Sequence, residues 1–478
     1  MKKNIRISLM SALIATALVA CDPGDFGDMN LDPNSPSVPV TANMLTSAQQ
    51  GLVGPITDTQ PTLYAQHISE KFYTEASRYG TQQFSFNGFY AGPLANLQEI
   101  IRLNTDEATK ATAAQNGPNV NQIAVARIMK AFYFWHMTDR WGPLPYTQAL
   151  QGRDNFKPSY DTQEAIYTDL FKELKEAAAQ ITPGAIDGDI LLDGDMDHWK
   201  TFANSMRLVM ALRLSEVKPD MAKAEFVSAY QAGIISSNAE NVIYEFLADE
   251  NNDNPWEDRF LTRLDFNISK PLADLMLATN DPRLPVFADV AVLTQKYVGM
   301  PYGLEQGAAG AIPNGQVSFL GTDLRQQDSP GYVMTYAQMQ FSLAEGAMRG
   351  WITGNAKTFY EEGIKASFQQ YDVYNEAEYK AFIADPTVAY APAKGLEQII
   401  TQKWVSLYTY GYEAWAEFRR TGFPKLTPAA NPISVSKIIP LRQGYPTTER
   451  DLNGDNYNAA LTMLGGKDDL DMPVWWDK

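Results

Sequence analysis

Apolar residues recur at steps of three and four over most of this chain, and that period limits the fold more than any other feature. The clearest run is Val125, Ile128, Phe132 and Trp135, and it stops at Gly142-Pro143. A strand would alternate every second residue instead. We therefore expect an all-α, mainly helical fold with little β structure. Further runs of the same period cover residues 166–181, 199–214, 339–351, 360–371 and 396–420.

Neighbouring runs are spaced like the members of helix pairs. The runs 339–351 and 360–371 flank Gly354, which predicts a helical hairpin. The starts near Thr162 and His198 are 36 residues apart, close to the ~34-residue period of tetratricopeptide pairs. The signature spacing is not kept elsewhere, so we expect tetratricopeptide-like pairs rather than a regular solenoid.

Three long stretches without helical period interrupt these runs. Residues 72–96, 240–270 and 295–332 are rich in glycine, asparagine, proline and aromatic residues. Long irregular loops in a compact body are usually functional or disordered, and a high aromatic content argues against disorder. We expect these loop insertions to carry the function.

The amino-terminal segment has the features of an export signal. Lys2, Lys3 and Arg6 precede an apolar stretch, residues 7–20, that is too short to span a bilayer. It ends at Cys21, the sole cysteine of the 478 residues, so an internal disulfide is impossible. The segment resembles a bacterial lipobox, which implies a signal peptide over 1–20 and lipidation of Cys21.

The resemblance to a lipobox also divides the chain. We expect a lipidated tether over residues 21–43, because its acidic, turn-rich composition suits a flexible spacer, and one helical body over 44–478. Acidic residues just after the lipidated cysteine resemble the surface-export signal of some Gram-negative lipoproteins. The resemblance implies an outer-membrane protein that faces the cell exterior.

The charge of the chain excludes some partners. The formal net charge is −17, and it becomes −20 without residues 1–20, which hold three cations and no acid. Phosphate backbones and anionic lipid surfaces attract clustered lysine and arginine, which this composition opposes. We expect no nucleic-acid binding, and membrane contact through the lipid anchor alone.

Motifs of catalysis and metal binding are missing from the sequence. HExxH, GxSxG and phosphate-loop patterns do not occur, and His67, His136 and His198 form no metal-spaced pair. We therefore expect no enzyme. The 56 acids do not exclude a glycosidase pair, so a surface glycoside hydrolase stays open as an alternative.

Two acidic stretches resemble half of a calcium loop, residues 187–197 and 451–456. Turns and helix caps use the same residue types, and we favour that interpretation. We expect no cofactor, with calcium as the alternative.

The aromatic residues of the three loops suit sugar recognition. Sugars lie on exposed rings through their C–H faces, while nearby polar side chains bond their hydroxyls. Plugging the core under each loop is the alternative role for any single ring. The candidate ligand-binding residues are Tyr79, Phe89, Tyr90, Trp256, Arg259, Tyr302 and Asp323.

Several segments, in this order, resemble the SusD/RagB family of outer-membrane nutrient-binding lipoproteins, in its second SusD-like branch. They are NLDPN at 30–34, DRWGPLPY at 139–146, DPRL at 281–284, WAEFRRTG at 415–422, PLRQGYP at 440–446 and VWWD at 474–477. The resemblance implies a helical, non-enzymatic lid over a SusC-like TonB-dependent transporter, which captures an oligosaccharide or sometimes a peptide. An adaptor that contacts the transporter alone is a second alternative. No binding residue carries over by motif, so the candidates above rest on the loop argument.

Overall fold

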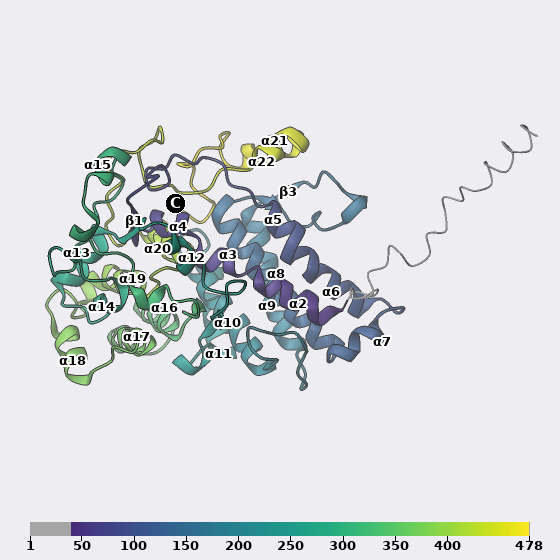
Figure 1. The fold of residues 1–478 in the computed structure, drawn as a ribbon. Coiled ribbons are helices and arrows are strands. Elements are labelled where there is room, and N and C mark those ends of the chain that lie inside the picture. Colours follow the sequence, from purple (N-terminus) through teal and green to yellow (C-terminus); the bar gives the residue numbers. More distant parts are fainter. Residues whose placement is uncertain (1–39, 478) are drawn as a thin grey trace, which may run out of the picture. The chain divides into compact units, whose positions relative to one another are not determined.

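The computed structural model describes residues 40–477, and helices dominate this part of the chain (Figure 1). Four pairs of consecutive helices pack against each other. They are α8 (Asn119–Trp141) with α9 (Gln163–Gln180), α10 (Met196–Arg213) with α11 (Pro219–Ala232), α16 (Tyr336–Met348) with α17 (Ala356–Gln370), and α19 (Gly395–Ser406) with α20 (Gly411–Thr421). The predicted all-α fold of helix pairs is confirmed.

The shorter helices lie before, between and after these pairs. Before α8 come α2 (Thr41–Gln50), α3 (Val53–Thr57), α4 (Thr59–Tyr64), α5 (Asn87–Phe89), the π-helical η2 (Tyr90–Leu94), α6 (Ala95–Thr105), α7 (Lys110–Ala113) and η3 (Ala114–Asn116). After α11 come η5 (Asn238–Glu240), α12 (Pro255–Leu261), α13 (Lys270–Ala278), α14 (Leu284–Phe287), α15 (Gln306–Gly310), η6 (Asn314–Gln316), η7 (Thr322–Leu324), α18 (Glu376–Ala384), η8 (Pro392–Lys394), α21 (Thr447–Leu452) and α22 (Gly454–Met463), while η4 (Gly152–Asp154) lies between α8 and α9.

Strands are short and form three antiparallel pairs within the described residues. They are β1 (Ile68–Glu70) with β5 (Phe266–Ile268), β2 (Leu144–Pro145) with β3 (Tyr160–Asp161), and β4 (Val242–Tyr244) with β6 (Gly331–Met334). In the β1–β5 pair, Glu70 lies opposite Phe266, which fixes the first irregular stretch against the second. None of the helices in residues 40–477 has the length and apolar character needed to cross a bilayer.

The sequence placed most helix ends correctly, because caps and stops mark them. Helix α8 ends at Gly142, whose φ of +82° suits glycine. Helix α9 begins after Thr162, whose side chain caps Ala165 N, and ends before Pro183. Helix α2 begins at Thr41 and so covers the last residues of the segment predicted as a tether.

The single helix predicted over residues 396–420 is wrong. The chain forms two helices, α19 and α20, separated at Thr409, whose φ is +69°. The break lets α20 turn onto α4, where a Cβ on Gly411 would lie 2.1 Å from the backbone nitrogen of Thr62. Tight packing of α20 on α4 therefore overrides the helical period.

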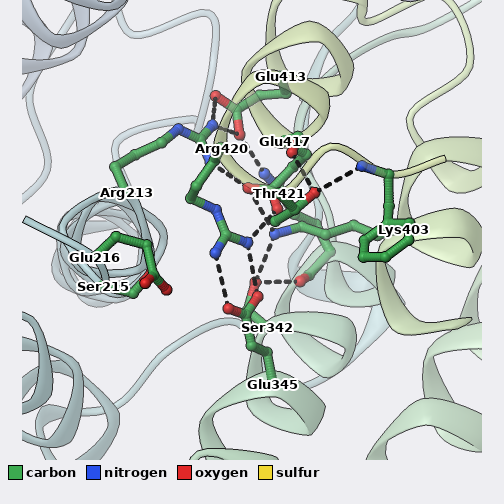
Figure 2. A network of polar contacts seen from close by, with 12 residues as sticks. Arg213, Ser215, Glu216, Ser342, Glu345, Lys403, Glu413, Glu417, Arg420 and Thr421 are labelled. Atoms are coloured by element: carbon green, nitrogen blue, oxygen red, sulfur yellow. Dashed lines mark hydrogen bonds and ion pairs between the residues drawn. The ribbon is translucent and has the colours of Figure 1, made fainter. Parts of the chain in front are cut away.

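A buried ionic network joins the helix pairs from inside (Figure 2). Glu417 of α20 contacts Arg213 of α10, and it also pairs with Arg420 at 2.6 Å and Lys403 at 3.3 Å. Burial opposes ionisation of Glu417, but the attraction of these cations outweighs it and holds the Glu417 pKa well below its usual range. Arg420 continues the network to Glu345 of α16 at 2.7 Å. Oppositely charged partners therefore lock α10, α16, α19 and α20 together.

Candidate functional site

One cavity is lined by all three irregular stretches, and we call it the three-loop site. Its volume is about 550 Å³. The lining residues are Phe72 and Tyr73 from the first stretch, Phe260, Leu261, Thr262, Arg263 and Leu264 from the second, and Gln306 and Asn314 from the third. The loops expected to carry the function thus meet at one place.

Hydrogen bonds beside the β1–β5 pair fix the first two loops. The backbone nitrogen of Lys71 donates to the Asp265 carbonyl at 2.9 Å, and that of Phe72 donates to the Asp265 carboxylate at 2.7 Å. Tyr73 follows with a φ of +53°, a value that is uncommon outside glycine. The pinned backbone therefore holds Tyr73 in a conformation that a free loop would avoid.

The third loop is attached to the same frame. The Met300 nitrogen donates to the carbonyl of Ile268 in β5 at 2.9 Å. The first loop reaches the third through the buried side chain of Lys71, whose ammonium donates to the Ile312 carbonyl. Because backbone and buried side-chain bonds connect all three loops, the cavity is formed before any ligand arrives.

Exposed rings and methyl groups form the wall of the three-loop site. Tyr73 is 59% exposed, Leu261 65% and Leu264 38%. The Arg263 guanidinium carbon lies 4.8 Å from the centre of the Tyr73 ring, and the Arg325 guanidinium lies 4.4 Å from that of Phe260. Tyr73 and the two leucines give an apolar wall, and Arg263 supplies hydrogen-bond donors beside it, the arrangement that a sugar ring needs.

A buried carboxyl group lies under the first loop. Glu70 accepts a hydrogen bond from the Ser77 nitrogen at 2.9 Å. Burial raises the pKa of Glu70 to about 8, the Ser77 bond opposes the shift, and the Asp265 and Glu75 charges add to it. The raised pKa favours the protonated, neutral form of the Glu70 carboxyl group under the first loop.

Three of the predicted ligand-binding rings lie in the core. Tyr79 is 0% exposed, Trp256 2% and Tyr302 8%. The Tyr79 hydroxyl accepts from the Ala429 nitrogen at 2.9 Å, and that of Tyr302 donates to the Leu63 carbonyl at 2.7 Å. None of these rings has an open face for a sugar. They support the loops from below, so we assign the contact surface to their exposed neighbours.

The other predicted residues are not gathered at the three-loop site either. Arg259 lies over the Trp256 ring at 4.6 Å, and burial lowers its pKa to about 10. Asp323 is exposed in η7 and is not a lining residue. Phe89 packs against Tyr133 and Trp141, and Tyr90 lines a different cavity.

The sequence contained only part of the signal for this site. Phe72, Tyr73 and Phe260 belong to the aromatic clusters of the loops, but nothing in the sequence separates exposed Tyr73 from buried Tyr79. One sequence pattern indicates an exposed apolar wall. Leu261 and Leu264 are apolar residues that flank Thr262 and Arg263 within a polar loop.

The metal-ligand residue types have structural partners. His67 is buried against Trp404, whose carbonyl lies 2.9 Å from its Nε2, and burial lowers the His67 pKa to about 3. Asp189 accepts from the indole of Trp199 at 2.7 Å, and Asp195 caps α10. These aspartates act as turn and cap residues, as we favoured for residues 187–197.

A separate group of three acids lies at the start of α12. Asp253, Glu257 and Asp258 place carboxylate oxygens within 4.8 Å of one another. Among the described residues, this group shows no further feature of a cation site.

Comparison with known proteins gives a consistent picture. A chitin-binding protein of known structure is 29% identical, with a TM-score of 0.80 over 91% of this chain and 99% of that chain. A SusD homologue from Bacteroides fragilis is 25% identical, with a TM-score of 0.80 over 92% and 100% of the two chains. A chitin-binding SusD homologue from Flavobacterium johnsoniae is 25% identical, with a TM-score of 0.74 over 92% and 97%.

A search of curated proteins gives no match. The family model SusD-like, described as starch-binding associating with outer membrane, matches residues 33–446. This match spans most of the chain, and the helical fold agrees with the solved structures. The chain therefore belongs to the SusD-like family of outer-membrane-associated, starch-binding proteins.

Proposed function

We propose that this protein binds an oligosaccharide at the three-loop site and delivers it to a SusC-like TonB-dependent transporter. It does so as a lipoprotein that is anchored through Cys21 and faces the cell exterior. The description of the family supports the outer-membrane association and the class of ligand. The solved chitin-binding relatives support a glycan rather than a peptide.

The observation that carries the proposal is the exposed Tyr73 ring. Tyr73 is held at positive φ by a backbone pinned to Asp265, and Leu261 and Leu264 extend its apolar face. A large side chain that is held exposed to solvent contributes little to the free energy of folding, because its apolar surface is not buried. Stacking against a ligand would bury this exposed apolar surface and so favour binding.

The polar part of the lining favours a neutral or amide-bearing sugar. Gln306 and Asn314 supply amide groups that donate and accept, and Arg263 supplies donors beside the ring. Chitin oligosaccharides offer acetamido groups to such amides and flat apolar faces to Tyr73. We therefore place chitin oligosaccharides first in the panel of ligands to be tested.

The same lining favours binding over hydrolysis. Glycosidases use a pair of carboxyl groups that flank the bond to be cleaved. None of the nine lining residues is aspartate, glutamate or histidine. Amide and guanidinium groups line the same cavity as this apolar wall, a combination that favours a small ligand over the protein contact of an adaptor.

Calorimetry with chitin, malto-oligosaccharide and peptide ligands tests the proposal. We expect one glycan to bind, and Tyr73→Ala to weaken it about tenfold or more, as for an aromatic anchor. The matched control is Tyr230→Ala, because Tyr230 is 37% exposed on α11, outside the loops. Equal loss in both variants, or no glycan binding at all, contradicts the proposal. New reducing ends in the mixture would reveal the hydrolase instead.

The lipid anchor needs a separate test, because Cys21 lies outside the described residues. We expect the wild-type protein to partition into detergent with the mass of an acylated amino terminus, and Cys21→Ser to stay in the aqueous phase. Co-purification of a TonB-dependent transporter with the wild-type protein would support the partner. Aqueous wild-type protein of unmodified mass contradicts the anchor.

A further inference from the structure

A second cavity lies between the helices around α5 and the loop that joins β2 to β3, and we call it the Phe156 cleft. Its volume is about 610 Å³. Its walls come from α5, η2, the start of α6, residues 145–158 and Glu449 of α21. It shares no lining residue with the three-loop site, and α5 and β3 lie apart from α15 and β1 (Figure 1). The proposal below therefore does not depend on the oligosaccharide site.

Aromatic rings form much of the wall of the Phe156 cleft. The Phe86 and Tyr90 rings are 5.6 Å apart and meet edge to face. The Tyr90 hydroxyl is already used, since it donates to the Pro145 carbonyl at 2.5 Å, so Tyr90 offers the cleft mainly its ring. Phe156 is 78% exposed at the rim. An apolar or aromatic ligand body fits between these rings.

The charge in the cleft is negative and not fully compensated. Glu99 and Glu449 are the charged residues among the lining residues. Arg102 neutralises Glu99 through two bonds of 2.6 and 2.7 Å. Among residues 40–477, the Glu449 carboxylate accepts from two neutral donors, the Tyr160 hydroxyl at 2.7 Å and the Asn453 amide at 3.4 Å. Within the described part of the chain, no lysine or arginine nitrogen lies within 4.0 Å of the Glu449 carboxylate.

The cations near the cleft are not among its lining residues. Arg127 and Lys130 line an adjacent hollow, where Arg127 pairs with Glu173 at 2.9 Å and Lys130 donates to Gln98 at 2.6 Å. Arg153 and Lys157 belong to the same loop as Phe156, but both are exposed and neither lines the cleft. Of the two acids that line the cleft, Glu449 is thus the one without an ion-pair partner among residues 40–477.

We propose that the Phe156 cleft binds an organic cation, an ammonium or guanidinium group carried on an apolar body. The cation pairs with Glu449 while its body lies against Tyr90 and Phe156. A carboxylate beside aromatic rings attracts such ions twice, through the charge and through the negative faces of the rings. The chain from residue 21 onward, with a formal charge of −20, also draws cations to its surface. Basic peptide side chains and amino sugars share this chemistry.

Phenethylammonium and its neutral isostere phenethyl alcohol test the proposal by calorimetry on the full body. We expect the cation to bind about tenfold more tightly than the alcohol. Glu449→Gln should reduce this preference to within about twofold, while its amide oxygen still accepts from Tyr160 and keeps the fold. Phe156→Ala should weaken both probes, the cation at least as much as the alcohol, and since Phe156 is exposed this variant folds. The matched control is Glu107→Gln, because Glu107 is an exposed glutamate in the link between α6 and α7 that does not line the cleft.

The outcomes separate binding from a purely structural role for Glu449. If Glu449 only anchors Tyr160 and Asn453, Glu449→Gln leaves the cation-to-alcohol ratio unchanged, and the proposal fails. It also fails if the two probes bind equally to the wild-type protein. A fall in the ratio that is specific to Glu449→Gln supports it.

Two further titrations identify the source of the cation. A blocked lysyl-phenylalanine dipeptide represents peptides, and the dimer of glucosamine represents amino sugars. Competition of either one with phenethylammonium supports the proposal and names the source. If neither competes and the cation shows no preference over the alcohol, the cleft is not a cation site.

Discussion

The interior of the helix pairs and the three-loop site use the same residue types in opposite ways. Inside, the fully buried Arg213 contacts Glu417 and pairs with Glu413 at 2.9 Å. At the loops, Arg263 is about half exposed, and its carboxylate neighbour Asp265 lies at 4.0 Å and already accepts from Phe72. The interior arginine is held between acidic protein partners, whereas the loop arginine keeps donors for a ligand.

Aromatic residues show the same contrast. Tyr79 and Tyr302 bury their rings and bond their hydroxyls to backbone groups, whereas Tyr73 exposes its ring a few residues from Tyr79. Buried rings therefore mark the scaffold, and exposed rings and donors mark the candidate recognition surface. The following variants test this division, and the first should have the largest effect.

Glu417→Gln should destabilise the protein by about 3–5 kcal/mol, because it leaves Arg420, Lys403 and Arg213 buried with a missing partner. Chemical denaturation measures the free energy of unfolding. The control is Glu376→Gln, since Glu376 is an exposed partner of Lys380 and its loss should change little. A loss below about 1 kcal/mol for Glu417→Gln would show that the network does not hold the helix pairs.

Tyr302→Ala should cost about 3–4 kcal/mol of stability, since it removes a buried ring and one of the donors to the Leu63 carbonyl. Tyr302→Phe keeps the ring and should cost about 1 kcal/mol. Thermal and denaturant unfolding measure both. At temperatures where Tyr302→Phe is folded, its glycan affinity should equal that of the wild-type protein. A large loss of glycan affinity in folded Tyr302→Phe would show that the Tyr302 hydroxyl contacts the ligand.

Glu70 should make stability depend on pH. Its pKa is raised to about 8 in the folded state from a usual value of 4.5, so the folded protein holds a proton that the unfolded chain releases. The stabilisation is complete below pH 4.5 and is lost as pH rises toward 8, by about 3 kcal/mol between pH 5 and 8. Glu70→Gln should abolish this slope. Unfolding curves at several pH values measure it, and an unchanged slope in Glu70→Gln assigns the titration to another group.

The helix pairs were predictable because their signal is local and repeated. The period around Phe132 and the stop at Gly142 together define α8 without any long-range information. The break at Thr409 was not predictable from the sequence, since no glycine or proline lies between Val405 and Tyr410. The turn is imposed by packing of α20 on α4. Local propensity gives way there to tertiary contact.

The candidate site was predictable only at the level of whole loops. Their composition indicated that all three carry function, and they do meet at one cavity. Which ring faces outward depends on the hydrogen bond from Phe72 to Asp265, a contact between residues 193 positions apart. Sequence periodicity does not contain such a contact. It therefore does not distinguish the buried Tyr79 and Tyr302 from the exposed Tyr73.

Arg263→Lys should have the smallest effect on stability and a clear one on binding. Arg263 is about half exposed, so losing its contact with Tyr73 should change the free energy of unfolding by less than about 0.5 kcal/mol. Lysine keeps the charge but loses the planar group that lies over the ring and the fixed set of donors. We expect glycan affinity to fall several-fold.

The size of the loss in glycan affinity shows whether Arg263 acts through its planar donor group or through its positive charge. Arg263→Met removes the charge as well, and if the guanidinium acts through its planar donors, Arg263→Lys and Arg263→Met should lose similar affinity by calorimetry. If lysine instead restores wild-type affinity, the arginine acts only as a positive charge, and an anionic sugar rather than a neutral one becomes the ligand to test. Because both variants leave the pinned backbone of Tyr73 untouched, a difference between them reports on recognition and not on folding.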